Sequence, residues 1–394
     1  MAAAREPRSP RARADQLQRG TGRSHAVSAG RLVAFGDNAI LAVPRTGRVA
    51  ILNPPARFAC EAFAAGRPFA KVISDYAQRY GISPDRAEQD LRELRRRVAR
   101  ITRRSPRPPT ATAPAAAACP PDLETICAPG PRAVRLTVHG SRRLARLLRF
   151  LLQPVRTDSP AHRHLRGIRC GRAYEISCDG RLLTRTDNLL LARSEILRHL
   201  LLLSHGRRRW LAFLHAAAVA AEGRAWLIAG SSGSGKSTLA AALLREGFAI
   251  ATDDYAPLEA GSGLLHRVPF AMGIKDASIA LLRGTLPAID GIPAVRFRNR
   301  EVRYVAPPVL APERLPVGGL LFPLYDPQAA PELSPLSPEQ AFTLCARGGG
   351  WYEGSPRRLA ELVRWFRQRP AWMLTYPDTR SALDLVLPLL GSTR

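Results

Sequence analysis

The chain has 394 residues, with 59 lysines or arginines against 32 acidic residues, so its formal net charge is +27 at pH 7. Its six cysteines form no C-x-x-C pair, and no run of about 18 apolar residues occurs, so the sequence argues against zinc-bound, disulfide-stapled and membrane-spanning proteins. We expect a cytoplasmic protein with two domains.

The N-terminal part of the chain changes character near residue 29. Residues 1–28 are rich in Arg, Ala and Ser and lack hydrophobic periodicity, so we expect them to be disordered. Apolar runs at 40–43 and 49–52, on either side of a turn at 44–48, predict a β-hairpin. Residues 29–102 are therefore assigned to a small winged-helix-like α+β domain, with helices expected at 56–65, 69–80 and 84–98.

The sequence of this domain resembles that of a known family. Leu52-Asn53 after a strand, a helix that ends near Gly66, and an acidic helix with a basic end are similar to the PqqD-type peptide-recognition domain. The resemblance implies that the hairpin edge pairs with the leader of a precursor peptide as an added strand. The alternative is a winged helix that binds DNA, which the three arginines at 95–97 would suit.

A Pro/Ala-rich stretch marks the boundary between the domains. Its low-complexity part covers 103–122, and we assign residues 103–130 to a linker and 131–394 to the second domain. In the second domain the pattern predicts β-rich runs at 133–139, 173–177, 210–220, 318–323 and 371–376, a hairpin at 294–305, and helices at 141–152, 188–203, 337–344, 357–367 and 381–390.

The segment 230–237, GSSGSGKS, matches the phosphate-binding pattern G-x-x-x-x-G-K-[ST] in full. A buried strand is expected before it at 225–229 and a helix after it at 236–246, which is the context that this motif requires. Its glycines let backbone N–H groups surround phosphate oxygens, Lys236 can reach the β- and γ-phosphates, and Ser237 suits Mg²⁺. The predicted nucleotide contacts are Gly230, Ser231, Ser232, Gly233, Ser234, Gly235, Lys236, Ser237 and Thr238.

Two acidic residues follow the next predicted strand, at 248–252. Asp253 and Asp254 stand at its carboxyl end, where ligands bind in open α/β sheets. One carboxylate can hold Mg²⁺, for which we select Asp253 together with Ser237, and one can accept the proton of an attacking hydroxyl. The alternative is that both acids cap the turn that follows.

Lysine is rare in this chain, with three residues against 56 arginines. Besides Lys71 and the loop lysine, the third is Lys275. Where arginine is the default cation, a lysine marks a position that needs a compact ammonium, so Lys275 is a predicted phosphate contact. The alternative is an ordinary surface lysine.

The order of His215, the glycine-rich loop and the Asp pair resembles the core of HPr kinase/phosphorylase and its relatives, which phosphorylate serines of proteins or peptides. The resemblance implies an α/β P-loop kinase core of the HPr kinase/PEP carboxykinase-like type, with His215 close to the phosphates and with ATP and Mg²⁺ as cofactors. The chain has Thr238 where HPr kinases usually have Glu and Ala216 where they have Gly. It is therefore more similar to a diverged, HPr-kinase-related subfamily, and the reverse phosphorylase reaction is not part of the expectation.

We expect an ATP-dependent serine/threonine kinase that acts on a ribosomal precursor peptide or small protein captured by the N-terminal domain. Two alternatives are a DNA-binding regulator whose P-loop domain senses ATP, and a kinase of a small metabolite. Nucleic acid is not the expected partner, because the arginines are spread over the whole chain and aromatic residues are only 6%. The sequence leaves open whether the chain forms a homo-oligomer.

Overall fold

The computed structural model describes residues 30–43, 47–102, 120–231, 233–283, 287–297 and 300–391. Residues 1–28, which we expect to be disordered, and most of the predicted linker lie outside this part of the chain. Residues 1–104 with 354–359 form one compact unit, and residues 105–353 with 360–394 form another. We call them the N-terminal and the C-terminal unit.

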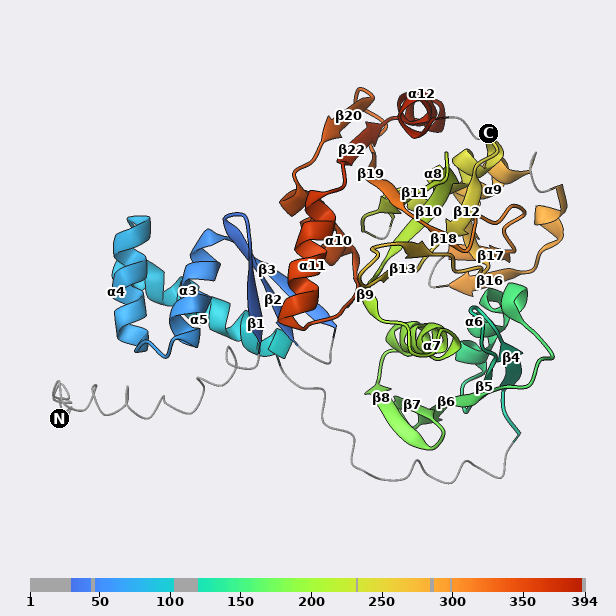
Figure 1. Cartoon of the computed structure of the whole chain (residues 1–394), viewed down its shortest axis with the longest axis horizontal. Helices are drawn as coiled ribbons and strands as arrows, with labels where there is room; N and C mark the ends of the chain where they lie inside the picture. Colours follow the sequence, from blue (N-terminus) through green and yellow to red (C-terminus); the bar gives the residue numbers. More distant parts are fainter. Residues whose placement is uncertain are drawn as a thin grey trace, which may run out of the picture. The chain divides into compact units, whose positions relative to one another are not determined.

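The N-terminal unit begins with a three-stranded antiparallel sheet in the order β1-β2-β3 (Figure 1). The predicted hairpin is confirmed as β2 and β3. The pattern did not predict β1, because four of its five residues are exposed or only half-buried and form no apolar face. The three strands are β1 (Arg31–Phe35), β2 (Asn38–Val43) and β3 (Arg48–Leu52).

Three helices follow in this unit, and all three predicted helices are confirmed. Asn53 caps the first of them, because its Oδ1 accepts a hydrogen bond of 3.1 Å from the N–H of Ala56. Gly81, with φ of +62°, ends the second in the left-handed conformation that suits glycine. Val72 and Leu91 are fully buried where the helices pack together. The helices are α3 (Pro54–Ala64), α4 (Phe69–Tyr80) and α5 (Pro84–Thr102).

The C-terminal unit contains a five-stranded sheet in the order β4-β5-β6-β7-β8, covered by two helices whose leucines share its apolar core. Strand β4 lies inside the segment predicted as linker, so that prediction was wrong for residues 123–127. The Pro/Ala bias ends before this strand, and alternate β4 positions are buried against the core. The elements are β4 (Leu123–Cys127), β5 (Val134–His139), α6 (Arg142–Leu151), β6 (Arg163–Cys170), β7 (Ala173–Cys178), β8 (Arg181–Thr186) and α7 (Leu189–Ser204).

A six-stranded sheet in the order β12-β10-β11-β19-β22-β20 forms the centre of the C-terminal unit. Strands β11, β19 and β22 run parallel to one another, and β12 shares their direction because both β11 and β12 are antiparallel to β10. Helices α8 and α12 pack on this sheet around a common apolar core. The elements are β10 (Ala216–Ala221), β11 (Arg224–Ala229), α8 (Lys236–Arg245), β12 (Ala249–Thr252), β19 (Val317–Tyr325), β20 (Glu332–Pro335), β22 (Ala371–Tyr376) and α12 (Thr379–Leu390).

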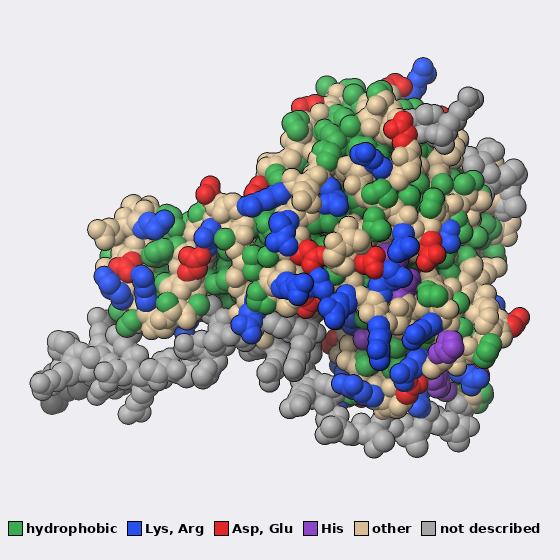
Figure 2. Space-filling view, in the orientation of Figure 1, with side chains coloured by type: hydrophobic (Ala, Val, Ile, Leu, Met, Phe, Trp, Pro, Cys, Tyr) green, Lys and Arg blue, Asp and Glu red, His purple; other side chains and the backbone are tan. Residues whose placement is uncertain are grey.

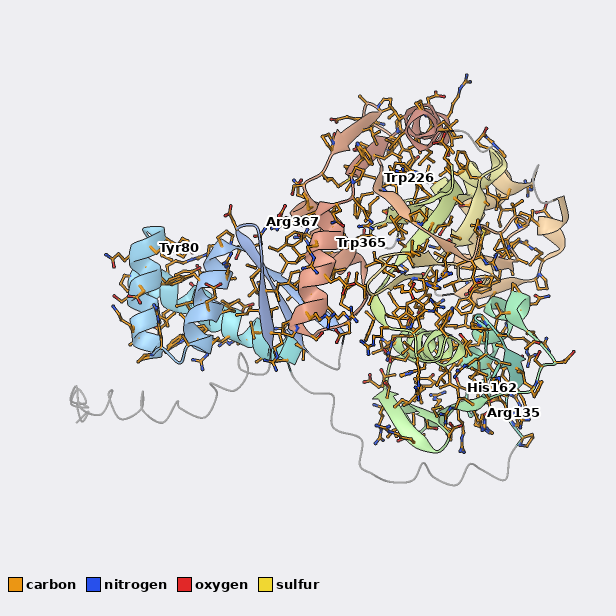
Figure 3. All side chains as sticks on the ribbon, viewed as in Figure 1. Tyr80, Arg135, His162, Trp226, Trp365 and Arg367 are labelled. Carbon is orange, nitrogen blue, oxygen red and sulfur yellow. The ribbon has the colours of Figure 1, made fainter. Side chains whose placement is uncertain are left out.

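Two further sheets, one of five strands and one of three, complete this unit in the orders β18-β14-β13-β9-β21 and β15-β17-β16. Trp365 on α11, labelled in Figure 3, attaches that helix to this unit by donating a hydrogen bond of 3.0 Å from Nε1 to the Gly263 carbonyl. The elements are β9 (Trp210–Leu214), β13 (Ala256–Glu259), β14 (Leu265–His266), β15 (Met272–Lys275), α9 (Asp276–Leu282), β16 (Ala294–Phe297), β17 (Arg300–Val305), β18 (Arg314–Leu315), α10 (Pro338–Gly348), β21 (Gly350–Tyr352) and, from residue 360 on, α11 (Pro356–Arg367).

The β-rich run predicted at 210–220 is two strands that belong to different sheets. Strand β9 pairs with β13 and β21, whereas β10 pairs with β11 and β12. Only His215 stands between β9 and β10. The position of the His215 side chain therefore depends on the strand pairing in both sheets.

Basic side chains occur over the visible surface of both units with acidic ones among them (Figure 2). Among the described residues, no helix has the length and apolar character needed to cross a membrane.

Candidate functional site

The segment 230–238, which we call the glycine-rich loop, runs from the end of β11 into the first turn of α8. Gly230, Gly233 and Gly235 have φ values of +137°, +92° and +100°. Glycine adopts such positive angles readily, whereas residues with a Cβ atom rarely do. A Cβ on Gly235 would also overlap the hydroxyl of Tyr376. The glycine spacing of the motif is thus required by the backbone path and, at Gly235, by close packing as well.

Lys236 begins α8 and turns its side chain back into the loop. Its Nζ donates hydrogen bonds to the carbonyls of Gly230, at 3.0 Å, and Ser231, at 2.9 Å. Burial lowers the pKa of Lys236, with the nearby Lys275 acting in the same direction and the acid pair opposing both. Two loop carbonyls therefore hold this ammonium inside the curve of the loop.

Asp253 lies directly after β12 and is tied to the neighbouring sheet. The N–H of Gly273 on β15 donates a hydrogen bond of 2.9 Å to Oδ2 of Asp253. Burial, followed by the negative charge of Asp254, raises the pKa of Asp253 to about 6, while Gly273 and the Ser237 hydroxyl oppose that rise. Oδ1 of Asp253 is buried and has no hydrogen-bond partner among the described residues.

Asp254 is held between Arg193 and His215. Arg193 Nη2 donates to Oδ2 at 2.9 Å, and His215 Nδ1 lies 2.9 Å from Oδ1. Burial acts to raise the pKa of Asp254, but the His215 hydrogen bond and the Arg193 charge outweigh it and hold this pKa well below its ordinary value. Two adjacent carboxyl groups thus have pKa values displaced in opposite directions, an arrangement that separates their chemical roles.

These groups meet at one edge of the six-stranded sheet, which we call the carboxyl edge because β11, β12, β19 and β22 all end there. Ala216 pairs with Ala229, so His215 stands beside the start of the glycine-rich loop. Ala218 pairs with Thr252, which puts the acid pair at the same edge on the other side of β10. The structure therefore brings His215, the loop lysine and both aspartates together.

Three other residues were predicted to contact the nucleotide, and each has a different position in the structure. Thr238 is turned toward α9, where its hydroxyl lies 2.9 Å from that of Ser278, so its side chain is already engaged. Lys275 ends β15, shares the strand face of Gly273, and lies close enough to Lys236 for the two charges to interact. Ser232 lies outside the described residues.

The loop serines that the structure describes have distinct environments. Ser231 is exposed and uses its carbonyl to accept from Lys236, whereas Oγ of Ser234 is buried without a hydrogen-bond partner among the described residues. Ser237 is half-buried and faces Asp253 closely enough to act on its pKa.

Sequence reasoning missed two residues of this site, Arg193 and Gly273. Arg193 lies on α7, 61 positions before Asp254, in a chain where arginine is the most common cation. Gly273 contributes only its backbone N–H, which leaves no mark on the sequence. The one available signal for Gly273 was its place two residues before Lys275.

The donor set fits Mg²⁺ only together with a phosphate ligand. Among the described residues, no group of three or more His, Cys, Asp or Glu side chains could hold a metal ion. Mg²⁺ typically takes one or two protein oxygens and fills its octahedron with water and substrate phosphates. The unpartnered Oδ1 of Asp253 and the neighbouring Ser237 hydroxyl supply that number of protein oxygens.

No protein-family model and no curated protein matches the chain. The residues of the carboxyl edge are therefore the basis for assigning a function.

Proposed function

We propose that this protein is an ATP-dependent kinase, related to HPr kinase, that transfers a phosphoryl group to a serine or threonine hydroxyl. The observation that carries the proposal is the meeting of the glycine-rich loop, the acid pair and His215 at the carboxyl edge. A loop of this kind binds triphosphates, and an acid next to it gives the acceptor hydroxyl a place to leave its proton.

The residues divide the work according to their surroundings. The Lys236 ammonium, which donates to two loop carbonyls in this structure, would donate to phosphate oxygens when ATP is bound. Asp253 and Ser237 would hold Mg²⁺, which when bound neutralises charge on the transferred phosphoryl group. Either carboxylate of the pair would accept the hydroxyl proton: Asp253 has the higher pKa, whereas Asp254, with its side chain 28% exposed, is more accessible but must first release a contact with Arg193 or His215.

The acceptor we propose is a precursor peptide or small protein captured by the N-terminal unit. Among the described residues, the outer edge of β1 has no strand partner, so its backbone groups can pair with an extended peptide. Capture at such an edge raises the effective concentration of the acceptor at the kinase unit.

Incubation of the purified full chain with γ-labelled ATP and a leader-bearing peptide from its genomic neighbourhood tests the proposal. We expect label on a peptide serine or threonine, and loss of that label in the Asp254→Asn variant. Label that survives in the double variant Asp253→Asn/Asp254→Asn would remove the proposed role of the acid pair.

The same assay separates the competing functions. A leaderless peptide should show a raised KM with a similar kcat if the N-terminal unit captures the leader, because only uniform binding is lost. Label that appears only on a free small-molecule hydroxyl would favour a metabolite kinase. ATP binding without any transfer, together with salt-dependent binding of duplex DNA, would favour the regulator.

A further inference from the structure

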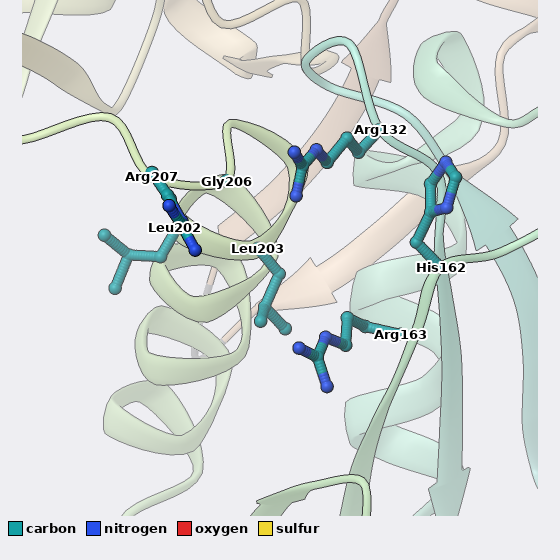
Figure 4. Close-up of a pocket in the computed structure, with 7 residues that line it drawn as sticks. All are labelled: Arg132, His162, Arg163, Leu202, Leu203, Gly206 and Arg207. Carbon is teal, nitrogen blue, oxygen red and sulfur yellow. The ribbon is translucent and has the colours of Figure 1, made fainter.

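A second concave site lies in the C-terminal unit and shares no residue with the candidate kinase site. It is a cavity of about 640 Å³ whose walls include Arg132, His162, Arg163 and Arg207 above two leucines of α7, Leu202 and Leu203. Figure 4 shows the three arginine side chains extending into the same space. They come from three separate segments of the chain, before β5, at the start of β6 and after α7.

Backbone hydrogen bonds hold these three segments together. The N–H of Arg132 donates to the Ser204 carbonyl at the end of α7, at 3.0 Å, and the N–H of His162 donates to the Ala133 carbonyl at 2.9 Å. Gly206, with φ of +65°, lets the turn after α7 pass so close to Arg132 that a Cβ there would lie 2.9 Å from the Arg132 Cζ atom. The walls of the cavity are thus set by the fold, not only by flexible side chains.

The charge of the cavity is poorly compensated. Arg163 pairs with Asp179 at 2.8 Å, whereas Arg132 and Arg207 have no acidic partner among the described residues. Guanidinium groups that point into one space repel one another unless an anion lies between them. The planar fork of each guanidinium matches the paired oxygens of a phosphate or carboxylate.

We propose that this cavity binds a phosphate group. Arg132 and Arg207 contact the phosphate oxygens, and Leu202 and Leu203 lie against the apolar part of the molecule that carries it. Two uncompensated guanidinium groups balance the two negative charges of a phosphate, whereas a single carboxylate would balance one of them. The inference does not depend on the kinase activity proposed above.

Calorimetric titration of the full chain tests this inference. The Lys236→Ala variant serves as the background, so that the glycine-rich loop does not compete for the probes. The probes are a short phosphoserine peptide, its glutamate counterpart and inorganic phosphate, at low salt because exposed charges are screened. We expect at least tenfold weaker phosphoserine binding after Arg132→Gln/Arg207→Gln and no change after Arg143→Gln, an exposed arginine of α6 that does not line the cavity.

The outcomes separate the sources of the phosphate. Binding of both phosphate probes, lost in the double variant, supports a free phosphate ligand, and binding of the peptide alone, lost in the double variant, supports a phosphorylated side chain. Equal binding by all variants, preference for the glutamate peptide, or no binding of either phosphate probe overturns the inference. Circular dichroism of the double variant checks that its fold is intact.

Discussion

Arg193 Nη2 lies 2.9 Å from Oδ2 of Asp254. Helix α7, which covers the β4–β8 sheet, therefore fixes a carboxylate at the carboxyl edge of the six-stranded sheet. His215 contacts the other oxygen of the same carboxylate. Asp254 therefore has both oxygens engaged, and its orientation depends on a residue that is not part of the glycine-rich loop or of β12.

The Arg193→Gln variant tests this dependence. Removing a residue that orients a reacting group typically costs about 10- to 100-fold in activity. We expect a decrease of that size in single-turnover phosphoryl transfer, with ATP affinity changed less than about twofold, because among the described residues Arg193 bonds to Asp254 and not to the loop. The matched control is Arg198→Gln on the same helix, since Arg198 pairs with Glu195 instead of Asp254. Loss of ATP binding with normal transfer at saturation would contradict the assigned role.

The Lys236→Ala variant tests the glycine-rich loop as a triphosphate site. A buried ammonium that contacts phosphate oxygens contributes charge-assisted hydrogen bonds, so its loss should weaken ATP binding by about tenfold or more. Equilibrium dialysis with labelled ATP measures the change. Lys71→Ala is the control, because Lys71 is 65% exposed and pairs with Asp75 in the N-terminal unit. Equal ATP affinity in the two variants would show that the loop is not the binding site.

The Gly235→Ala variant tests the packing of the loop against β22. Alanine at a φ of +100° is strained, and strain of this kind costs about 1–3 kcal/mol of unfolding free energy. The new methyl group also overlaps the Tyr376 hydroxyl, so adding Tyr376→Phe should recover part of the loss. Urea denaturation of the single and double variants measures both effects, and a double variant no more stable than Gly235→Ala would argue against the Tyr376 contact.

His199 on α7 should make the protein less stable in acid. Burial, together with the positive charge of Arg198, lowers the pKa of His199 from 6.5 to about 3. Glu195 lies 3.7 Å from the imidazole, but Arg198 already pairs with that carboxylate and donates to His199 Nε2 at 3.0 Å, so the neutral ring is favoured.

The sign of the effect follows from this lowered pKa. Below pH 6.5 the unfolded chain takes up a proton at this site that the folded chain resists, so stability is full above that pH and falls as the pH decreases toward 3. The contribution lost at pH 5 is about 2 kcal/mol. Urea denaturation at pH 7 and pH 5 should show a smaller decrease for His199→Gln than for the parent chain. Equal decreases would contradict the burial of a neutral imidazole.

Several elements were predictable to the residue because local signals mark their ends. Helix α4 and strand β22 begin and end where the sequence predicts, at 69–80 and 371–376, since glycine or proline flanks each of them. Strands β6 and β8 were not predicted, because arginines and other polar residues interrupt the apolar positions of both and neither forms an apolar run. Strand β8 pairs with β7 across a turn at Asp179-Gly180, where both residues have positive φ.

The candidate site divides in the same way. The loop and the acid pair were readable because each lies in one short stretch next to a strand. His215 was proposed by resemblance, and its position depends on pairing between β10 and β11. Arg193 was not predictable, since its contact with Asp254 arises only when two distant segments pack together.

His215 is the whole connection between β9 and β10, so the chain has no additional loop residues at this position. One extra residue there would turn every side chain of one adjoining strand to its opposite face, because neighbouring strand positions point in opposite directions. A substitution can thus change the side chain at position 215. An insertion or deletion beside it would disrupt the strand pairing in one of the two sheets. Length variation in this protein should therefore accumulate elsewhere, in the turns far from this connection.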